Sequence, residues 1–241
     1  TAGNPTSRDA NAADKVGGLN VSISLGSSES SSKSNQTITK VQSSKVVAGG
    51  DIAINATGAA DNSDINIIGS QIKASNNLTI KAQDQINLLA AANTDSFNSK
   101  NRSSSSNVGV SYGTDGLMLN IAASKGKGRE NGQNITWTET TVQSGGPVQL
   151  KSDSDTNLKG AIISGQQVIA DVGNSLNIQS LQDTSTYTSK QQAIGGSLAV
   201  GYGKVGGSVN YSKNATDSDS ASVIEQSGIM AGDGGFQVHV N

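Results

Sequence analysis

The sequence predicts an all-β protein, a parallel β-helix from which antiparallel hairpins extend. Three observations lead to this prediction. Short segments alternate apolar and polar residues, which is typical of strands with one buried face. These segments recur at a spacing of about twenty residues, which indicates stacked β-helical coils. The 241 residues are 33% hydrophobic and only 3% aromatic, and the thin core of a β-helix needs few large side chains.

The alternating segments are short, and each follows a Gly, Asn or Asp that favours a turn. They lie at 52–54, 65–67, 78–80 and 86–88. Coils in such a fold stack about 4.8 Å apart and bring equivalent residues into register. We therefore expect Asn66 over Asn87, and Asn157 over Asn177. Ile178 is expected to be a buried residue of the same ladder.

A longer repeat contains the short one. Residues from Ile86 onward match those from Leu176 onward at an offset of ninety, and Gly49-Gly50 resembles Gly145-Gly146 at an offset of ninety-six. We expect a single β-helical array over 1–241, divided into module 1 at about 16–105, module 2 at 106–192 and a partial module 3 at 193–241. Such an array is expected to be a fragment of a longer protein.

Segments rich in Gly and Ser, with longer alternation, predict the hairpins. One runs from 194–202 through a turn at Gly203-Lys204 into 205–213. A second joins 108–112 to 117–121, and the first copy retains 19–25. Polar loops are expected beside them, at 27–35 and 100–107.

Composition excludes several classes of function. The 17 basic and 19 acidic residues give a net charge of −2, so no nucleic-acid partner is expected. The chain has no Cys and therefore no disulfide framework or thiolate site. No run of eighteen apolar residues predicts a membrane helix, and residues 1–8 do not predict a signal peptide. A His-dependent catalytic site would rest on His239 alone, which is expected to point outward.

Three longer segments carry a family resemblance. They read LKGAIISG at 158–165, ADVGNSLNIQSLQD at 170–183 and IIGSQIKA at 67–74. The chain resembles, over about 16–241, the hemagglutinin repeat of filamentous hemagglutinins and contact-dependent growth inhibition toxins, which are exported by two-partner secretion. The motifs are turn-and-core patterns, so they are specific for the family rather than for one activity.

The resemblance implies a right-handed parallel β-helix in an exoprotein that is secreted or held on the surface of a Gram-negative bacterium. It implies a non-catalytic region that assists delivery of a C-terminal toxin across the outer membrane of a target cell. The expected partners are that outer membrane or a surface component, and the rest of the exoprotein, namely its export domain and toxin. The alternative is an adhesin segment that binds host glycans or receptors.

No catalytic, cofactor-binding or metal-binding residue is expected. Asp64 with Asp84, or Asp153 with Asp155, could supply the paired carboxylates of glycosidic cleavage, but their turn positions favour capping of backbone groups. The acidic segments 61–64 and 217–219 match no calcium-binding loop. Gly201–Gly206 fits G-x-G-x-x-G, yet a strand follows it where a dinucleotide site needs a helix.

Other residues leave two interpretations open. Residues 125–129 form a basic loop, solubilising or in contact with an anionic glycan or lipopolysaccharide phosphate. Trp137 packs over a coil or stacks on a sugar. The strands of the 194–213 hairpin are close to the length that crosses a membrane, with Tyr202 and Tyr211 as interface aromatics. These hairpins either enter a membrane during delivery or form a flap packed along the β-helix.

Overall fold

The structure, a computed structural model, describes residues 21–59, 62–114 and 116–241. These residues form strands and turns without an α-helix, so the all-β prediction is confirmed. They fall into two compact units. The hairpin unit holds the described residues within Thr1–Gln36, Phe97–Gly132 and Tyr187–Asp217, and the β-helix unit holds those within Thr37–Ser96, Gln133–Thr186 and Ser218–Asn241. Leu19 and Asp61, named above, lie outside the described residues, as does everything from 1 to 20.

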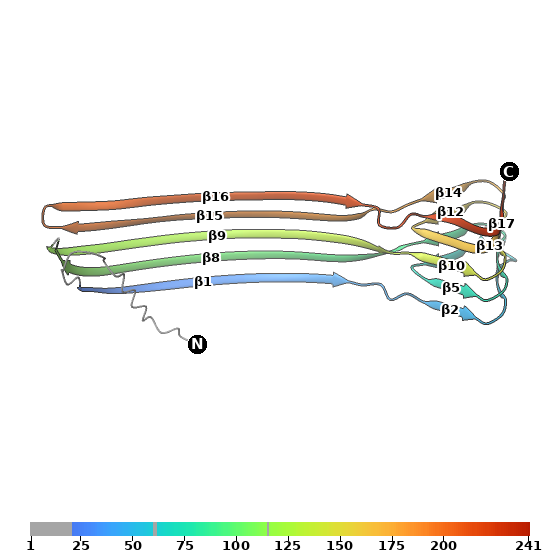
Figure 1. The fold of residues 1–241 in the computed structure, drawn as a ribbon, viewed down its shortest axis with the longest axis horizontal. Coiled ribbons are helices and arrows are strands. Elements are labelled where there is room, and N and C mark those ends of the chain that lie inside the picture. The colour runs from blue at the N-terminus through green and yellow to red at the C-terminus, as the bar shows by residue number, and fades with distance from the viewer. Residues whose placement is uncertain (1–20, 60–61, 115) are drawn as a thin grey trace. The chain divides into compact units, whose positions relative to one another are not determined.

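The β-helix unit is a stack of five coils in the described part of the chain. A full coil contains three short strands, because a turn former interrupts the alternation after each. The first coil is β2 (Lys45–Ala48), β3 (Ile52–Ala56) and β4 (Ile65–Ile68); the second is β5 (Gln71–Ala74), β6 (Leu78–Ala82) and β7 (Ile86–Leu89). The third is β10 (Thr140–Ser144), β11 (Val148–Ser152) and β12 (Thr156–Lys159); the fourth is β13 (Ala161–Val172) and β14 (Leu176–Gln179), and β17 (Gly228–Val240) is the fifth. Figure 1 shows β2, β5, β10 and β13 of successive coils side by side.

Every strand of one coil pairs in parallel with the equivalent strand of the next. β2, β5 and β10 line the first face, β3, β6 and β11 the second, and β4, β7, β12 and β14 the third. The longer β13 and β17 span the first two faces and shift register between Gly165 and Gln167. The parallel β-helix is therefore confirmed.

Side chains that alternate along these strands meet inside the coils and form the core. Because equivalent strands pair in register, inward apolar residues stack on apolar residues of the next coil. Leu78 stacks on Val148, and Val148 on Val168. The large side chains that are fully enclosed are Leu78, Ile80, Ile86, Leu88, Val142, Val148, Leu150, Leu158, Ile163, Val168 and Val172. Each contributes about 1.5–3 kcal/mol of hydrophobic stabilisation relative to an exposed position.

The outward side of the third face carries the asparagine ladder expected from the twenty-residue period. Asn87 Nδ2 donates to Asn66 Oδ1 at 2.9 Å, Asn157 Nδ2 to Asn87 Oδ1 at 2.8 Å, and Asn177 Nδ2 to Asn157 Oδ1 at 2.9 Å. Both predicted pairs are confirmed, and the Asn157–Asn87 bond joins them across four coils.

The prediction that Ile178 is buried is wrong, since its side chain is 47% exposed. It has the same register as Leu88 and Leu158, which are enclosed. The difference is that β14 is the outermost strand of its four-stranded sheet and pairs only with β12. No described strand pairs with the other edge of β14.

The hairpin unit is built on a five-stranded sheet in the order β1-β8-β9-β15-β16. Its strands are β1 (Val21–Thr39), β8 (Ala91–Gly113), β9 (Gly116–Thr138), β15 (Asp183–Gly201) and β16 (Lys204–Ser222). β8 turns directly into β9, and β15 into β16, so both predicted hairpins are confirmed. The first copy contributes β1, and what precedes it lies outside the described residues.

The hairpins are longer than the sequence predicted, and the loops expected at 27–35 and 100–107 are wrong. Both segments are strand. Their Ser and Asn residues favour turns only when the backbone lacks a better partner, and here a neighbouring strand supplies the hydrogen bonds. Side chains add to the pairing, because the Ser27 and Ser106 hydroxyls lie 3.1 Å apart and those of Ser105 and Ser124 lie 2.7 Å apart.

The connectivity explains both periods in the sequence. One coil takes about twenty residues, and a hairpin follows every second coil, after β7 and again after β14. Two coils and one hairpin therefore make the repeat of about ninety residues. Each hairpin is inserted at the same position of the coil, between a strand of the third face and the next strand of the first face.

Candidate functional site

Two of the four carboxylates weighed as catalytic pairs, Asp64 and Asp155, cap the backbone of a neighbouring coil. Asp64 Oδ1 accepts from the Gln85 amide at 3.1 Å, and Asp155 Oδ1 accepts from the Ser175 amide at 3.1 Å. Asp155 also accepts from Asn174 Nδ2 at 2.7 Å. Asp64 and Asp155 therefore cap backbone groups, but those of the next coil rather than those of their own turn, and their oxygens hold neighbouring turns together.

Three other acidic side chains lie around one cavity, where β9 ends and β10 begins. We call Glu139, Asp183 and Glu225 the carboxyl corner; they line a cavity of about 380 Å³ together with Trp137. Trp137 is half-buried, and its indole Nε1 donates to the Gln182 carbonyl at 3.0 Å. This bond holds the edge of the indole, while the ring also lines the cavity, so packing and sugar stacking both stay predictions for Trp137.

Glu139 is the residue of the carboxyl corner whose protonation is most disturbed. Its Oε2 is buried without a hydrogen-bond partner. Burial, followed by the hydrogen bond and the negative charge of Glu225 and the charge of Asp183, raises the pKa of Glu139 from 4.5 to about 7. The corner therefore holds a proton near neutral pH. Among the described residues, no group of three His, Cys, Asp or Glu side chains has the arrangement of a metal site.

The hairpin sheet has two distinct faces. Gly109 approaches Ser24 so closely that an added Cβ would lie 2.8 Å from the serine Cβ. Asn120 Nδ2 donates to Ser111 Oγ at 3.0 Å, and the Ser197 and Ser208 hydroxyls lie 2.8 Å apart. These residues share one side of the sheet, which we call the small-residue face. Because successive strand residues point to opposite sides, their neighbours in sequence share the other side.

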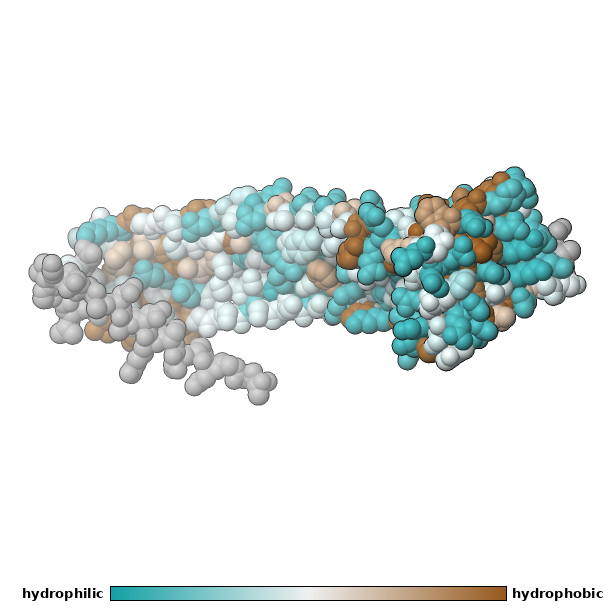
Figure 2. Space-filling model, turned by 45° about the vertical axis from the view of Figure 1, so that its right-hand side comes forward, coloured by the Kyte–Doolittle hydropathy of each residue, from teal (hydrophilic) through white to brown (hydrophobic). Residues whose placement is uncertain are grey.

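That other side is the apolar face. Toward the hairpin turns it carries sixteen large apolar side chains, from 41% exposed at Val200 to 99% at Tyr202. They are Val21, Ile23, Leu25, Val108, Val110, Tyr112, Leu117, Leu119, Ile121, Ile194, Leu198, Val200, Tyr202, Val205, Val209 and Tyr211. Figure 2 shows brown, hydrophobic atoms gathered toward the turn end of the hairpins, beside the pale colours of Ser and Gly. Because large exposed apolar patches mark interaction sites in proteins, this face is the candidate interaction surface.

Farther from the turns, the apolar face becomes cationic. Lys100, Arg102, Lys127, Arg129 and Lys190, which we call the cation cluster, line one hollow of about 270 Å³ with no acidic residue. Residues 125–129 lie within strand β9. The expectation of a basic loop at these residues is therefore wrong. The period-two spacing of Lys100 with Arg102, and of Lys125 with Lys127 and Arg129, was the available signal. It was missed because Ser and Gly around these residues favoured a loop.

The remaining candidates have structural places. Gly201–Gly206 spans the β15–β16 turn, where Gly203 has a φ of 71° and a strand follows, so the hairpin interpretation is confirmed. Asp217 and Asp219 lie exposed on β16, rather than in a loop. His239 is exposed on β17, as predicted. Its Nε2 hydrogen-bonds with Asn241 Oδ1 at 2.9 Å.

Coils in strict register, interrupted by hairpins that form a sheet of their own, define a β-helical repeat protein. The match to known families agrees with this class. The family model described as "Hemagglutinin repeat" matches residues 25–194. The chain therefore belongs to the hemagglutinin-repeat family, as its sequence motifs implied.

The relatives are large toxin-bearing proteins. The chain is 43% identical over 238 residues to "Toxin CdiA" of Escherichia coli, covering 95% of this chain and 8% of that protein. It is 42% identical to "Deoxyribonuclease CdiA" of Yersinia pseudotuberculosis serotype O:3 (strain YPIII), over 92% of this chain and 21% of that protein. A "Deoxyribonuclease CdiA" of Dickeya dadantii (strain 3937) is 38% identical over 92% of this chain and 7% of that protein.

The chain thus corresponds to about a fifth or less of each of these relatives. It is a repeat region of the kind found in CdiA exoproteins. No solved structure matched it. In the described part of the chain, no helix has the length and hydropathy needed to cross a membrane.

Proposed function

We propose that this chain is a non-catalytic region of a secreted or surface-held exoprotein of a Gram-negative bacterium, and that it assists delivery of a C-terminal toxin across a target cell's outer membrane. The observation that carries the proposal is the apolar face of the hairpin sheet. Sixteen large apolar side chains there are at least 41% exposed. Holding them in water is costly, and contact with a lipid surface relieves that cost.

The family relationship supplies the context. Two of the similar proteins are named as deoxyribonucleases and one as a toxin, so a region like this one accompanies toxic activity that must reach another cell. Two carboxylates that cap backbone amides support a non-catalytic role, because the oxygens of Asp64 and Asp155 accept hydrogen bonds that hold turns.

The test is an in-frame deletion of residues 16–241 from the full exoprotein, displayed on inhibitor cells. Attachment to target cells and entry of toxin are scored separately. We expect attachment to persist and entry to be lost. Lost attachment would instead assign the region to adhesion, through a receptor or glycan. If attachment and entry both persisted, the region would be a spacer and the delivery proposal would be wrong.

A further inference from the structure

The two units carry opposite charge, although the chain as a whole is close to neutral. The described residues of the hairpin unit contain nine Lys and Arg against three Asp and Glu, whereas those of the β-helix unit contain six against twelve. The positive charge is also concentrated on one side of the hairpin sheet. Lys33, Lys125 and Lys213 lie on the apolar face with the cation cluster, by the alternation that defines that face.

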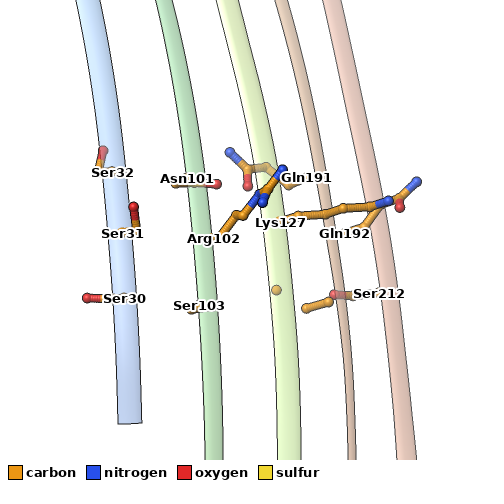
Figure 3. A pocket seen from close by; sticks show the side chains of 12 residues that line it. Ser30, Ser31, Ser32, Asn101, Arg102, Ser103, Lys127, Gln191, Gln192 and Ser212 are labelled. Atoms are coloured by element: carbon orange, nitrogen blue, oxygen red, sulfur yellow. The ribbon is translucent and has the colours of Figure 1, made fainter.

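Within the cluster, like charges lie directly opposite one another. The Asn98–Asn131 hydrogen bond on one side and the Ser105–Ser124 hydrogen bond on the other fix the pairing of β8 with β9. This register places Lys100 opposite Arg129, and Arg102 opposite Lys127. Figure 3 shows Arg102 and Lys127 on these neighbouring strands.

Directly opposed like charges destabilise a sheet. Among the described residues, none of the five cations of the cluster lies within ion-pair distance of an acidic side chain, whereas Lys151 and Asp171 in the β-helix unit do form an ion pair. Of the three described acidic residues of the hairpin unit, Glu130 is on the small-residue face, where it accepts from Gln191 Nε2 at 3.3 Å. By the alternation of β1 and β16, Glu29 and Asp217 lie on the apolar face, but neither lines the hollow of the cluster. The cluster is a costly arrangement in isolation, and a polyanion placed over the hollow would offset the repulsion.

We propose that the apolar face is a docking surface for a phosphate-bearing lipid membrane, in which the cation cluster binds lipid phosphates while the apolar side chains contact acyl chains. This inference rests on the proposed function and specifies its partner chemistry. Charge complementarity favours an anionic surface. The apolar side chains on the same face favour a lipid over a nucleic acid or a sulfated polysaccharide, because neither of these offers a hydrocarbon layer. Apolar residues beside Lys and Arg are the combination by which proteins lie on anionic membranes.

The first experiment measures co-flotation of the 241-residue chain with vesicles. One set contains phosphatidylcholine alone, another contains phosphatidylcholine with phosphatidylglycerol, and a third contains phosphatidylcholine with lipid A. We expect tighter binding to the two anionic sets, weakened by added salt. Equal binding to neutral and anionic vesicles would overturn the role of the cluster.

The double variant Arg102→Gln with Lys127→Gln tests the cluster directly. Each cation near an anionic surface changes affinity about five-fold, so the two substitutions should weaken binding to anionic vesicles by about twenty-five-fold. The matched control, Lys73→Gln with Lys81→Gln, removes the same charge from exposed positions of the β-helix unit and should leave binding within about two-fold of the unmodified chain. An equal loss in both double variants would show that only net charge matters, and would overturn the inference.

A second variant separates the lipid from other anions. Leu119→Ser with Val200→Ser removes two exposed apolar side chains and should weaken binding to all vesicles, with the far-ultraviolet circular dichroism unchanged. Competition with inorganic phosphate, heparin and double-stranded DNA completes the test. We expect these competitors to reduce vesicle binding only weakly. Tight binding of heparin or DNA with no binding of vesicles would assign the cluster to that class of partner and overturn the lipid inference.

The vesicle assays and the deletion test of the proposed function can fail independently. If the deletion abolishes toxin entry but the Arg102→Gln, Lys127→Gln exoprotein delivers toxin normally, the delivery role stands and the lipid inference is wrong. If vesicles bind as expected but the deletion leaves entry intact, the surface is correctly assigned and the delivery role is wrong.

Discussion

The β-helix unit and the hairpin unit use the same alternating pattern with opposite results. In the coils, residues such as Ile80 and Leu158 are enclosed because three faces surround them. In the hairpins, Leu119 and Val200 occupy equally regular strands, yet they are exposed on one side of a single sheet. Alternation therefore predicts that a strand has an apolar side. Whether that side is buried depends on how many other strands close over it.

The largest effect that can sharpen this comparison is expected from register partners within the β-helix. Leu158 is enclosed and Ile178 directly follows it in the ladder, but is 47% exposed. Leu158→Asp should lower the free energy of unfolding by about 4 kcal/mol or more, because it buries an unpaired charge. Ile178→Asp should cost about 1 kcal/mol or less.

Urea denaturation of both variants and of the unmodified chain measures the difference. An equal loss would mean that Ile178 is as well enclosed as Leu158, and would contradict its position at the edge of the ladder. Leu119→Asp in the hairpin unit serves as the exposed control and should resemble Ile178→Asp.

A smaller effect is expected from the asparagine ladder of the β-helix unit. Asn157→Ala removes two ladder hydrogen bonds, to Asn87 and from Asn177, and should destabilise the fold by about 1–2 kcal/mol. Asn177→Ala removes one and should cost about half as much. Thermal unfolding followed by circular dichroism tests this order, and equal losses would show that the ladder bonds contribute little.

The smallest effect comes from pH. The raised pKa of Glu139, about 7 against an ordinary 4.5, means that the folded state holds a proton that the unfolded state releases. This stabilisation is complete below pH 4.5 and is lost as the pH rises through about 7. Because Glu139 is partly exposed and solvent screens its charge, we expect a loss of about 1 kcal/mol between pH 5 and 8.

Urea denaturation across that pH range measures the slope. In Glu139→Gln the pH dependence due to this group should disappear, since the amide neither titrates nor repels Glu225. An unchanged slope in the variant would assign the pH dependence to other groups.

Much of the fold was predictable because its determinants are local. The twenty-residue period located the coils and the Asn66–Asn87 and Asn157–Asn177 pairs, since a stack in register repeats its turns and its inward residues at fixed intervals. The hairpin turns were predictable for the same reason. The extent of the hairpins was not, because residues 100–107 carry little strand preference and become strand only through pairing with β1 and β9.

The sequence by itself determined the strand pattern, the repeat and the family, because each depends on residue order along the chain. The tertiary structure alone decided three things. It exposed Ile178 by leaving β14 at an edge, and it partly buried Glu139 beside Glu225, a residue far away in sequence. It also brought the cations of β8, β9 and β15 together on one face. These outcomes depend on which strands become neighbours, and burial and electrostatic repulsion arise only once those neighbours are in place.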